Sequence, residues 1–467
     1  MDESYTVAAG RTLRLGYFDH PPAAWWMQWT AAHLLGTEAP IAVRLPFILT
    51  FALSTWLMYR LGAAIADYRA GLWAAVALNL SPVFSVTTGT WVLPDGPLDC
   101  ALLGAALCLV HALPDFPREG SARGVWVSWT GAGLCSGLAL FSKYTAILTI
   151  AGAGLYLLTS PLHRRWLARP QPYLAGVLAV VVFLPVLVWN ATHGWASFAF
   201  QGERATGLRF RPGQSFIVLA GEALFVLPWI WLPMMAAFIA ALRRGPAQWR
   251  SWLMCCLGAP PIVAFASIAA WSSQRILFHW AAPGYLMLFP LLGVWIADRT
   301  AARWVRLTLT GTAALIVAAV LIVSTQIRLD WLHPVIATVA KHDPDLEGID
   351  WVSLRTQLVA RGLLSPGTIV GVPNWRDAGK IAYALGPDAI VTVLNPDARQ
   401  FGLVHPEGNY TGDDLLVLAT EDPQQVRSAL APMFEGIETL PPASIEHRRI
   451  DQPVSVFVGH RLRGTPE

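Results

Sequence analysis

Acidic and basic side chains stand at or near the ends of apolar runs in this chain, where they could carry out transfer chemistry. Asp95 and Asp99 open one such run, Lys143 interrupts another, and His20 and His279 lie in the segments before two more. A carboxylate can accept a proton from a nucleophile, and a cation can stabilise the charge that develops on a leaving phosphate. These residue types favour group transfer from a phosphate-linked donor, provided that the fold gathers them at one surface.

The composition indicates which kind of fold must position these groups. Apolar residues make up 55% of the chain and charged residues 13%, with a mean hydropathy of +0.47, whereas soluble domains carry roughly 25% charged residues. This excludes an ordinary cytosolic enzyme and a disordered chain. The 33 basic and 30 acidic residues are too nearly balanced to predict a nucleic-acid partner. We therefore expect a mainly α, polytopic membrane protein.

The apolar runs predict about ten membrane spans, since about 20 helical residues suffice to cross a bilayer. The run from Val125 to Leu158 would measure about 51 Å as a single helix, so it must turn, and we place the turn at Phe141–Lys143. The expected spans are 44–66, 71–90, 92–113, 125–141, 143–160, 173–191, 215–242, 252–271, 280–298 and 306–326.

Arginines in alternate loops predict the orientation, because positive residues are retained on the cytoplasmic side. The loops near Arg69, Arg118, Arg164, Arg243 and Arg299 carry most of them. The opposite, outer face then receives the segments that hold the candidate groups and the chain after about residue 327. We expect Asp95 to be the more exposed of the two acids of its run, and Asp99, one turn deeper, to pair with a neighbour.

Three regions follow from this topology. Residues 1–43 form an outer loop that contains the acid pair Asp2–Glu3 and a Trp-rich interfacial helix near 22–35. Residues 44–327 form the transmembrane core. Residues 328–467 form a small α/β domain, which we interpret as a structural or acceptor-docking cap. Its expected strands are 368–372, 389–393 and 414–419, and its expected helices are 375–385 and 422–430.

Two further charged groups, Arg204 and Glu222, bear on the site. Arg204 lies in the outer loop 191–214, where several arginines run against the charge bias and suit bidentate phosphate contact. Glu222 lies inside a span, where a buried, hydrogen-bonded acid is the simpler interpretation. No group of His and Asp residues has convincing metal-ligand spacing and no glycine-rich nucleotide motif is present, so we expect neither a metal nor a cofactor.

Five motifs of this chain resemble the membrane-embedded C-type glycosyltransferases (GT-C), specifically the group that contains protein O-mannosyltransferases and the lipid A aminoarabinose transferase. The motifs are Asp2–Glu3 with Tyr17-Phe18-Asp19-His20-Pro21-Pro22, Ala42-Val43-Arg44-Leu45-Pro46, Pro94-Asp95-Gly96-Pro97-Leu98, Gly137-Leu138-Ala139-Leu140-Phe141-Ser142-Lys143-Tyr144 and His279-Trp280-Ala281-Ala282-Pro283-Gly284-Tyr285.

The resemblance implies specific roles for these residues. Asp2 would be the catalytic base with Glu3 in support, and Asp95 a second acid that helps to position substrates. His20 stands where some relatives carry a phosphate-contacting lysine, and Lys143 matches a basic residue near the donor phosphate. Arg204 and His279 would also bind the donor phosphate. In relatives a transmembrane helix precedes the acid pair, so we expect the true start to lie upstream.

These observations predict an inverting glycosyltransferase of a bacterial inner membrane, multi-pass, with the C-terminal domain on the periplasmic side. It would transfer a hexose or pentose from a polyprenyl-phosphate donor to a lipid, glycan or protein acceptor. Membrane lipid would be a further partner and nucleic acid none. A multi-helix transporter and an inactive relative with a binding role are the alternatives. The sugar, the acceptor and the oligomeric state are not readable from the sequence.

Overall fold

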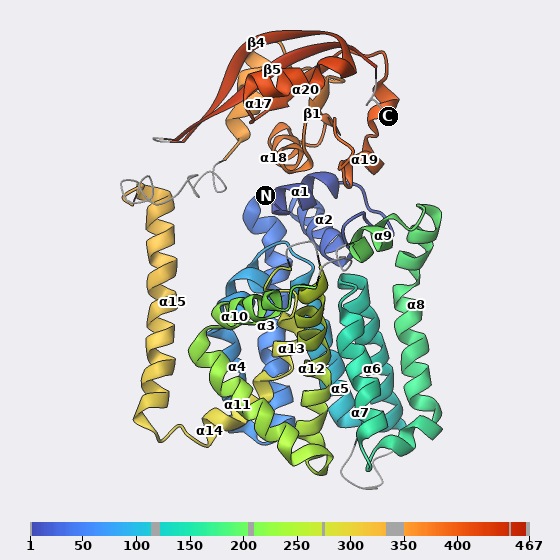
Figure 1. The fold of residues 1–467 in the computed structure, drawn as a ribbon, viewed down its shortest axis with the longest axis vertical. Helices are drawn as coiled ribbons and strands as arrows, with labels where there is room; N and C mark the ends of the chain where they lie inside the picture. Colours follow the sequence, from blue (N-terminus) through green and yellow to red (C-terminus); the bar gives the residue numbers. More distant parts are fainter. Residues whose placement is uncertain are drawn as a thin grey trace. The chain divides into compact units, whose positions relative to one another are not determined.

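The computed structural model describes residues 2–113, 122–203, 210–272, 276–332, 350–447 and 450–463. The chain divides into two compact units (Figure 1). One unit comprises residues 14–316, and the other combines residues 1–13 with residues 317–467.

Six helices are long and apolar enough to cross a bilayer, counted over the described residues. They are α3 (Pro40–Ile65), α5 (Asp95–Ala112), α6 (Ala122–Ser142), α8 (Pro170–Thr192), α12 (Trp249–Trp271) and α15 (Arg303–Leu329). Each coincides with a predicted span, which confirms a polytopic helical fold. Only 6% of the apolar window of α15 is buried, so this helix exposes most of its apolar side chains, as a lipid-facing helix does.

The remaining predicted spans are also helical, but their helices are short or broken. Residues 71–90 form α4 (Tyr68–Asn79) and the π-helix η1 (Val83–Thr88), and residues 143–160 form α7 (Ala146–Thr159). Residues 215–242 form α10 (Gly213–Val226) and α11 (Pro228–Arg244), which meet at an angle of 111°. Residues 280–298 form α13 (Ala282–Leu286) and α14 (Phe289–Ala297). Proline at position 228 and the positive φ of 83° at Leu227 account for the break between α10 and α11.

Small residues let the central helices approach closely. A Cβ atom on Gly133 of α6 would lie 2.5 Å from the carbonyl oxygen of Ala175 on α8, and one on Gly137 would lie 2.9 Å from that of Ala179. The spacing of these two glycines is that of the small-residue motif by which membrane helices pack. On its other side α6 packs along α5 (Figure 1). The three helices therefore run side by side, and their ends are fixed relative to one another.

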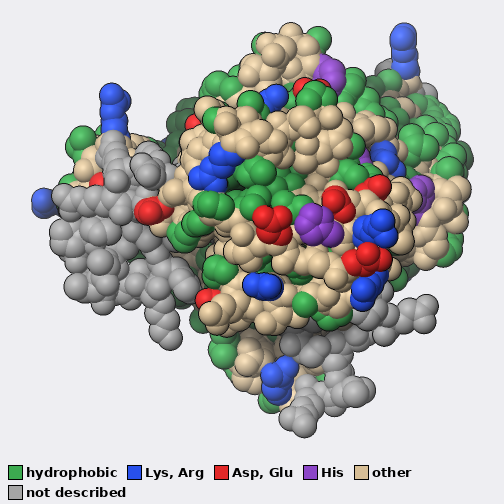
Figure 2. All heavy atoms as spheres, turned by 90° about the horizontal axis from the view of Figure 1, so that it is seen from above, with side chains coloured by type: hydrophobic (Ala, Val, Ile, Leu, Met, Phe, Trp, Pro, Cys, Tyr) green, Lys and Arg blue, Asp and Glu red, His purple; other side chains and the backbone are tan. Residues whose placement is uncertain are grey.

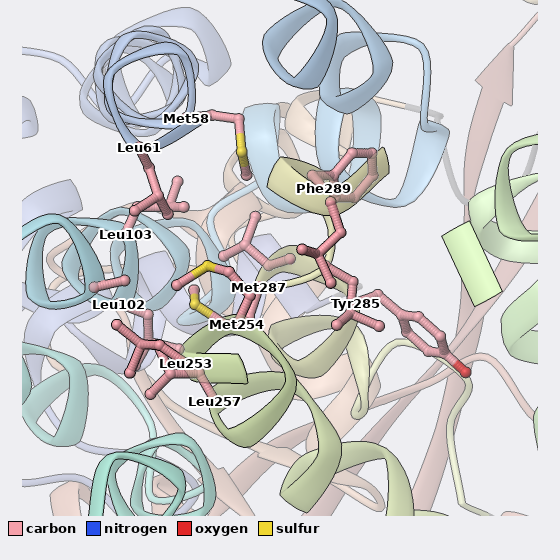
Figure 3. Packing of buried hydrophobic residues seen from close by; sticks show 14 of the residues in the cluster. Met58, Leu61, Leu102, Leu103, Leu253, Met254, Leu257, Tyr285, Met287 and Phe289 are labelled. Atoms are coloured by element: carbon pink, nitrogen blue, oxygen red, sulfur yellow. The ribbon is translucent and has the colours of Figure 1, made fainter. Parts of the chain in front are cut away.

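One apolar cluster fills the interior of the helical unit (Figure 3). Met58, Leu102, Met254 and Phe289 are among its fully or almost fully buried members and come from four different helices or helix segments. The aromatic ring of Tyr285 borders this cluster, while its hydroxyl group points away from it (Figure 3). Through this cluster, α13 and α14 pack against α3, α5 and α12.

Shorter helices complete the helical unit. The predicted Trp-rich helix is present as α2 (Ala23–Leu35), and α9 (Ala196–Glu203) follows α8. Two 3-10 turns, η2 (Arg164–Ala168) and η3 (Gly245–Ala247), connect longer helices. The predicted turn at Phe141–Lys143 is confirmed, since α6 ends at Ser142 and α7 begins at Ala146.

A five-stranded sheet with the order β2-β1-β3-β5-β4 forms the centre of the C-terminal domain. The strands β1 (Ile369–Val372), β2 (Ile390–Val393) and β3 (Leu415–Ala419) and the helices α18 (Trp375–Leu385) and α20 (Pro423–Leu430) confirm the predicted pattern. These three strands are parallel, and β5 pairs with β3 in the antiparallel sense. The remaining elements are α17 (Val352–Ala360), α19 (Phe401–Val404), η5 (Glu407–Tyr410), η6 (Ala431–Met433), β4 (Phe434–His447) and β5 (Ile450–Leu462).

The sequence analysis missed the β4–β5 hairpin of this domain. Figure 2 shows charged side chains of both signs interspersed on the face seen there. Side chains of the hairpin make polar contacts: His460 Nδ1 lies 3.0 Å from Asp414 Oδ2, and Arg461 Nη1 lies 3.7 Å from Glu435 Oε2. Such a surface is typical of a water-exposed domain.

The same unit contains α1 (Asp2–Ala9), a helix that the sequence analysis did not predict. It packs against α18, and Tyr5, Val7 and Ala9 of α1 are buried. The acid pair Asp2–Glu3 therefore starts a helix that belongs to the compact unit of the C-terminal domain.

Candidate active site

Asp95 and Lys143 form a buried ion pair at one end of the helical unit. The Lys143 Nζ atom donates to Asp95 Oδ1 over 2.8 Å, and the two side chains are 8% and 4% exposed. Asp95 is the first residue of α5, and Lys143 directly follows the last residue of α6. A helix N-terminus favours an anion and a helix C-terminus a cation, so both side chains occupy favourable ends of the two adjacent helices. The structure thus places at one surface two groups that lie far apart in the sequence.

Asp99 lies one turn further along α5, and like Asp95 it is buried in the helical unit. Its Oδ2 atom accepts a hydrogen bond of 3.0 Å from Thr88 Oγ1, whereas its Oδ1 atom is buried and lacks a hydrogen-bond partner. The expected pairing of Asp99 is confirmed. The expected difference in exposure is wrong, because the whole residues Asp95 and Asp99 are 3% and 4% exposed. The reason is the π-helix η1, which ends at Thr88 and packs closely over the start of α5. A Cβ atom on Gly96 would lie 2.7 Å from the Thr88 carbonyl oxygen.

Two histidines complete the group around Asp95. His279 and His20 both interact electrostatically with the Asp95 carboxylate, as Lys143 does. Both histidines are partly exposed, so they are accessible to a ligand. Three of the predicted site residues, from three separate segments of the chain, therefore interact with the Asp95 carboxylate.

Tyr17 fixes the loop that carries His20. Its ring is fully buried and stacks on Trp25 of α2, with ring centroids 4.3 Å apart and an angle of 7° between the planes. Its hydroxyl group accepts a 3.2 Å hydrogen bond from the backbone N–H of Arg14, and burial raises the pKa of Tyr17 to about 12. Gln201 of α9 donates to the carbonyl oxygen of Asp19 over 2.5 Å. These contacts hold the residues that directly precede His20.

A second polar network stabilises the turn that carries Lys143. Tyr144 shares a 2.8 Å hydrogen bond with Ser197 of α9, and Asn190 of α8 donates to the Tyr144 hydroxyl over 3.5 Å. The sequence analysis did not single out Gln201, Asn190 or Ser197 as site residues. Their only signal was their position in an outer loop or at its border, which many unrelated polar residues share.

The other predicted residues have no contact with Asp95 among the described interactions, or lie outside the described part. Asp2 begins α1, but its side chain lies outside the described residues, as does the whole of Arg204. Glu3 is partly buried. Glu222 accepts a 2.6 Å hydrogen bond from Tyr285 and is 1% exposed, which agrees with a buried, hydrogen-bonded acid. Over the described ranges, no group of three His, Cys, Asp or Glu side chains is arranged to hold a metal ion.

Known proteins share both the sequence and the fold around this cluster. Residues 19–189 match the family model described as dolichyl-phosphate-mannose-protein mannosyltransferase. The lipid A galacturonosyltransferase RgtD of Rhizobium johnstonii is 24% identical over 335 residues, which are 70% of this chain and 67% of that protein. ArnT from Cupriavidus metallidurans in the apo state superposes with a TM-score of 0.63 and 16% identity over 98% of this chain and 92% of its own. The family model, the curated relative and the solved structures all indicate the GT-C superfamily of membrane glycosyltransferases.

The GT-C fold accounts for nearly the whole chain, including the C-terminal domain. A second ArnT structure from Cupriavidus metallidurans, bound to undecaprenyl phosphate, superposes with a TM-score of 0.64 and 15% identity over 100% of this chain and 95% of its own. The family-model match includes Asp19, His20, Asp95 and Lys143. The GT-C assignment therefore rests on the same part of the chain as the cluster around Asp95.

Proposed function

We propose that this protein is a glycosyltransferase that transfers one sugar from a polyprenyl-phosphate donor to an acceptor that is a lipid, a glycan or a protein. The observation that carries the proposal is the cluster of Lys143, His20 and His279 around Asp95 at one end of a GT-C helical unit. A polyprenyl-phosphate donor keeps its phosphate at the membrane surface and its chain among apolar helices. Cations grouped at one end of a helical bundle suit that geometry.

Each residue of the cluster has a chemical task in this proposal. Lys143, His20 and His279 bind the donor phosphate and stabilise the negative charge that it gains as the sugar leaves. Asp95 holds the Lys143 ammonium group in place through their 2.8 Å contact. Arg204 is a further phosphate ligand. Because Lys143 is nearly buried, its charge is screened little by water and acts strongly at short range.

The transfer itself inverts the anomeric carbon in a single displacement. Asp2 accepts the proton of the acceptor hydroxyl or amine, with Glu3 in support, and the acceptor oxygen or nitrogen forms a bond to the anomeric carbon. The bond between that carbon and the phosphate oxygen breaks, and polyprenyl phosphate leaves with both electrons. A positioned general base contributes about 10²–10⁴ in rate.

The position in the cell follows from the arginine distribution. Arg69, Arg164, Arg243 and Arg299 lie at helix ends or in the short connections between helices, on the side that the positive-inside rule assigns to the cytoplasm. We propose a bacterial inner-membrane location, with the cluster around Asp95 and the C-terminal domain on the periplasmic side.

A donor panel tests the function directly. The purified protein in lipid nanodiscs is incubated with undecaprenyl-phosphate-linked hexoses and pentoses, each with lipid A, glycan or peptide acceptors. We expect release of undecaprenyl phosphate that depends on the acceptor, with loss of release in Lys143→Ala and in Asp2→Asn. Binding of undecaprenyl phosphate without release from any donor would contradict the proposal and favour a transporter or an inactive relative.

A further inference from the structure

The turn just before α13 directs three consecutive side chains to three different helices. The Phe278 ring packs on α10. His279 interacts electrostatically with the Asp95 carboxylate of α5. The Trp280 ring lies against Phe265 of α12, with ring centroids 5.8 Å apart. The two neighbours of His279 are therefore held by α10 and α12, while His279 itself contributes to the cluster around Asp95.

Gly221 lets α10 lie directly against the Phe278 ring. A Cβ atom at Gly221 would lie 2.3 Å from the Cδ1 and Cε1 atoms of that ring, whereas carbon atoms in contact are about 3.5–4.0 Å apart. Phe225, one turn further along α10, meets the same ring at an angle of 64°, with centroids 5.6 Å apart. A side chain at position 221 would therefore displace the Phe278 ring, and with it the backbone next to His279.

Tyr285 gives α10 a second contact with the same segment. Its hydroxyl group donates to Glu222 Oε2 over 2.6 Å, and both residues are 1% exposed. The backbone N–H of Ala282 donates to the His279 carbonyl oxygen over 3.1 Å, which joins the turn to the start of α13. The adjacent residues Gly221 and Glu222 thus contact the chain on both sides of His279.

Helix α10 is itself fixed near both of its ends. Near its start, the Ser215 hydroxyl donates to the Ala266 carbonyl oxygen of α12 over 2.6 Å. At its other end, the Val226 carbonyl oxygen accepts a 3.3 Å hydrogen bond from the Ser81 hydroxyl. The break at Leu227 separates α10 from the direction of α11. A short helix that is tied at both ends is suited to hold a neighbouring turn in one position.

We propose that α10 positions His279 for the donor phosphate. This inference rests on the proposed function, in which His279 stabilises the charge of the leaving phosphate. Because the phosphate gains negative charge as the sugar leaves, a correctly placed cation contributes more in the transition state than in the bound donor. The positioning residues in this scheme are Gly221, Glu222, Phe278 and Tyr285.

The substitution Gly221→Ala tests the contact, because the added methyl group must push the Phe278 ring away from α10. Alanine is a better helix former than glycine, so α10 itself is retained. Gly213→Ala is the matched control, since Gly213 belongs to the same helix and a Cβ atom there has nothing within 4 Å. For the full chain in nanodiscs, we expect hydrogen exchange of the amides 278–285 to accelerate in Gly221→Ala only, with the exchange of α5 unchanged.

The kinetic readout separates positioning from general stability. We expect kcat to fall by about 10²-fold in Gly221→Ala, the loss typical of a misplacement of about 1 Å, with a smaller change in KM for the donor. In a His279→Ala background the same substitution should cause no further loss, because the group that it misplaces has already been removed. Phe278→Leu gives the added methyl group room, so Gly221→Ala/Phe278→Leu should turn over faster than Gly221→Ala.

Tyr285→Phe is an independent variant that adds no bulk. It removes only the hydroxyl group that donates to Glu222. We expect kcat to fall by less than in Gly221→Ala, and again no further loss in the His279→Ala background. If Gly221→Ala does not fold, this comparison decides the inference.

Each remaining outcome would overturn the inference at an identifiable step. Unchanged exchange in Gly221→Ala would show that α10 does not hold the turn. Accelerated exchange with unchanged turnover would show that transfer does not depend on this placement of His279. An additive loss in the His279→Ala background would show that the substitution acts by another route.

A failure of the proposed function gives a different pattern. If the wild-type protein releases sugar from no donor, the proposed function is refuted, and binding of undecaprenyl phosphate then decides the inference. Binding should weaken in Gly221→Ala but not in Gly213→Ala, and Gly221→Ala should cause no further weakening in the His279→Ala background. Equal binding in Gly221→Ala and the wild type would refute the positioning of His279 as well.

Discussion

Replacement of Lys143 by methionine should destabilise the helical unit and abolish turnover, and a second substitution should restore only the stability. The side chains of Lys143 and Asp95 are 8% and 4% exposed, and their charged atoms are 2.8 Å apart. Removal of the ammonium group leaves a buried carboxylate without its cation, which costs about 3–5 kcal/mol. For a unit of this size that corresponds to a melting temperature lower by roughly 5–15 °C.

The reverse substitution, Asp95→Asn, leaves the buried ammonium group unpaired and should cost a similar amount. In the double variant Lys143→Met/Asp95→Asn neither charge remains, so the protein should be more stable than either single variant. Turnover should stay low in the double variant, because the cation that stabilises the leaving phosphate is still missing. Loss of one such group typically costs about 10²–10³ in rate.

The assay is thermal unfolding in detergent, followed by release of undecaprenyl phosphate at the same protein concentration. Lys380→Met serves as the matched control, since Lys380 lies over the Trp351 ring in the C-terminal domain and should contribute no more than about 1 kcal/mol. Single variants as stable as the wild type, or a double variant destabilised by the sum of the two single effects, would refute the role of a buried ion pair. Recovery of turnover in the double variant would refute the role of Lys143 in phosphate binding.

Three further substitutions test the surroundings of the site. Asp99→Asn keeps the acceptor for the Thr88 hydroxyl and removes a second buried carboxylate beside Asp95, so the melting temperature should not fall; a loss above about 1 kcal/mol would contradict this. Because the pKa of Tyr17 is raised to about 12 from 10.0, the wild type should lose on the order of 2–3 kcal/mol of stability as the pH rises from 10 to 12. Denaturant unfolding over that range should show a smaller loss in Tyr17→Phe. Tyr285→Phe, which leaves the buried Glu222 without its donor, should cost about 1–3 kcal/mol in thermal unfolding, and more than Glu222→Gln.

Much of the site could be predicted from local sequence alone. Lys143 is a single charge between two apolar runs, and one helix could not contain both, so the turn and the position of Lys143 at the end of a helix followed from length. Asp95 opens an apolar run after Pro94, which predicts a helix start at the same face. The sequence therefore predicted that Asp95 and Lys143 lie at the same face of the membrane. Their 2.8 Å ion pair is consistent with that expectation.

Other features depended on contacts between distant segments. The hydrogen bond from Thr88 to Asp99 requires the π-helix Val83–Thr88, and π-helical turns have no simple sequence pattern. The anchoring of the loop before His20 requires Gln201, which is 182 residues from the carbonyl group of Asp19 to which it donates. Such pairings are set by how whole helices pack, which hydrophobic periodicity does not encode.

The position of α1 is the clearest example of this division. The sequence determined that the chain is a helical membrane protein with an α/β domain at its end, because bilayer thickness and hydrophobic periodicity act within short windows of residues. It also determined which side chains are able to bind phosphate or accept a proton. Only the tertiary structure decided that the eight residues of α1 pack on α18, since a helix so short is stabilised by distant partners and not by its own residues.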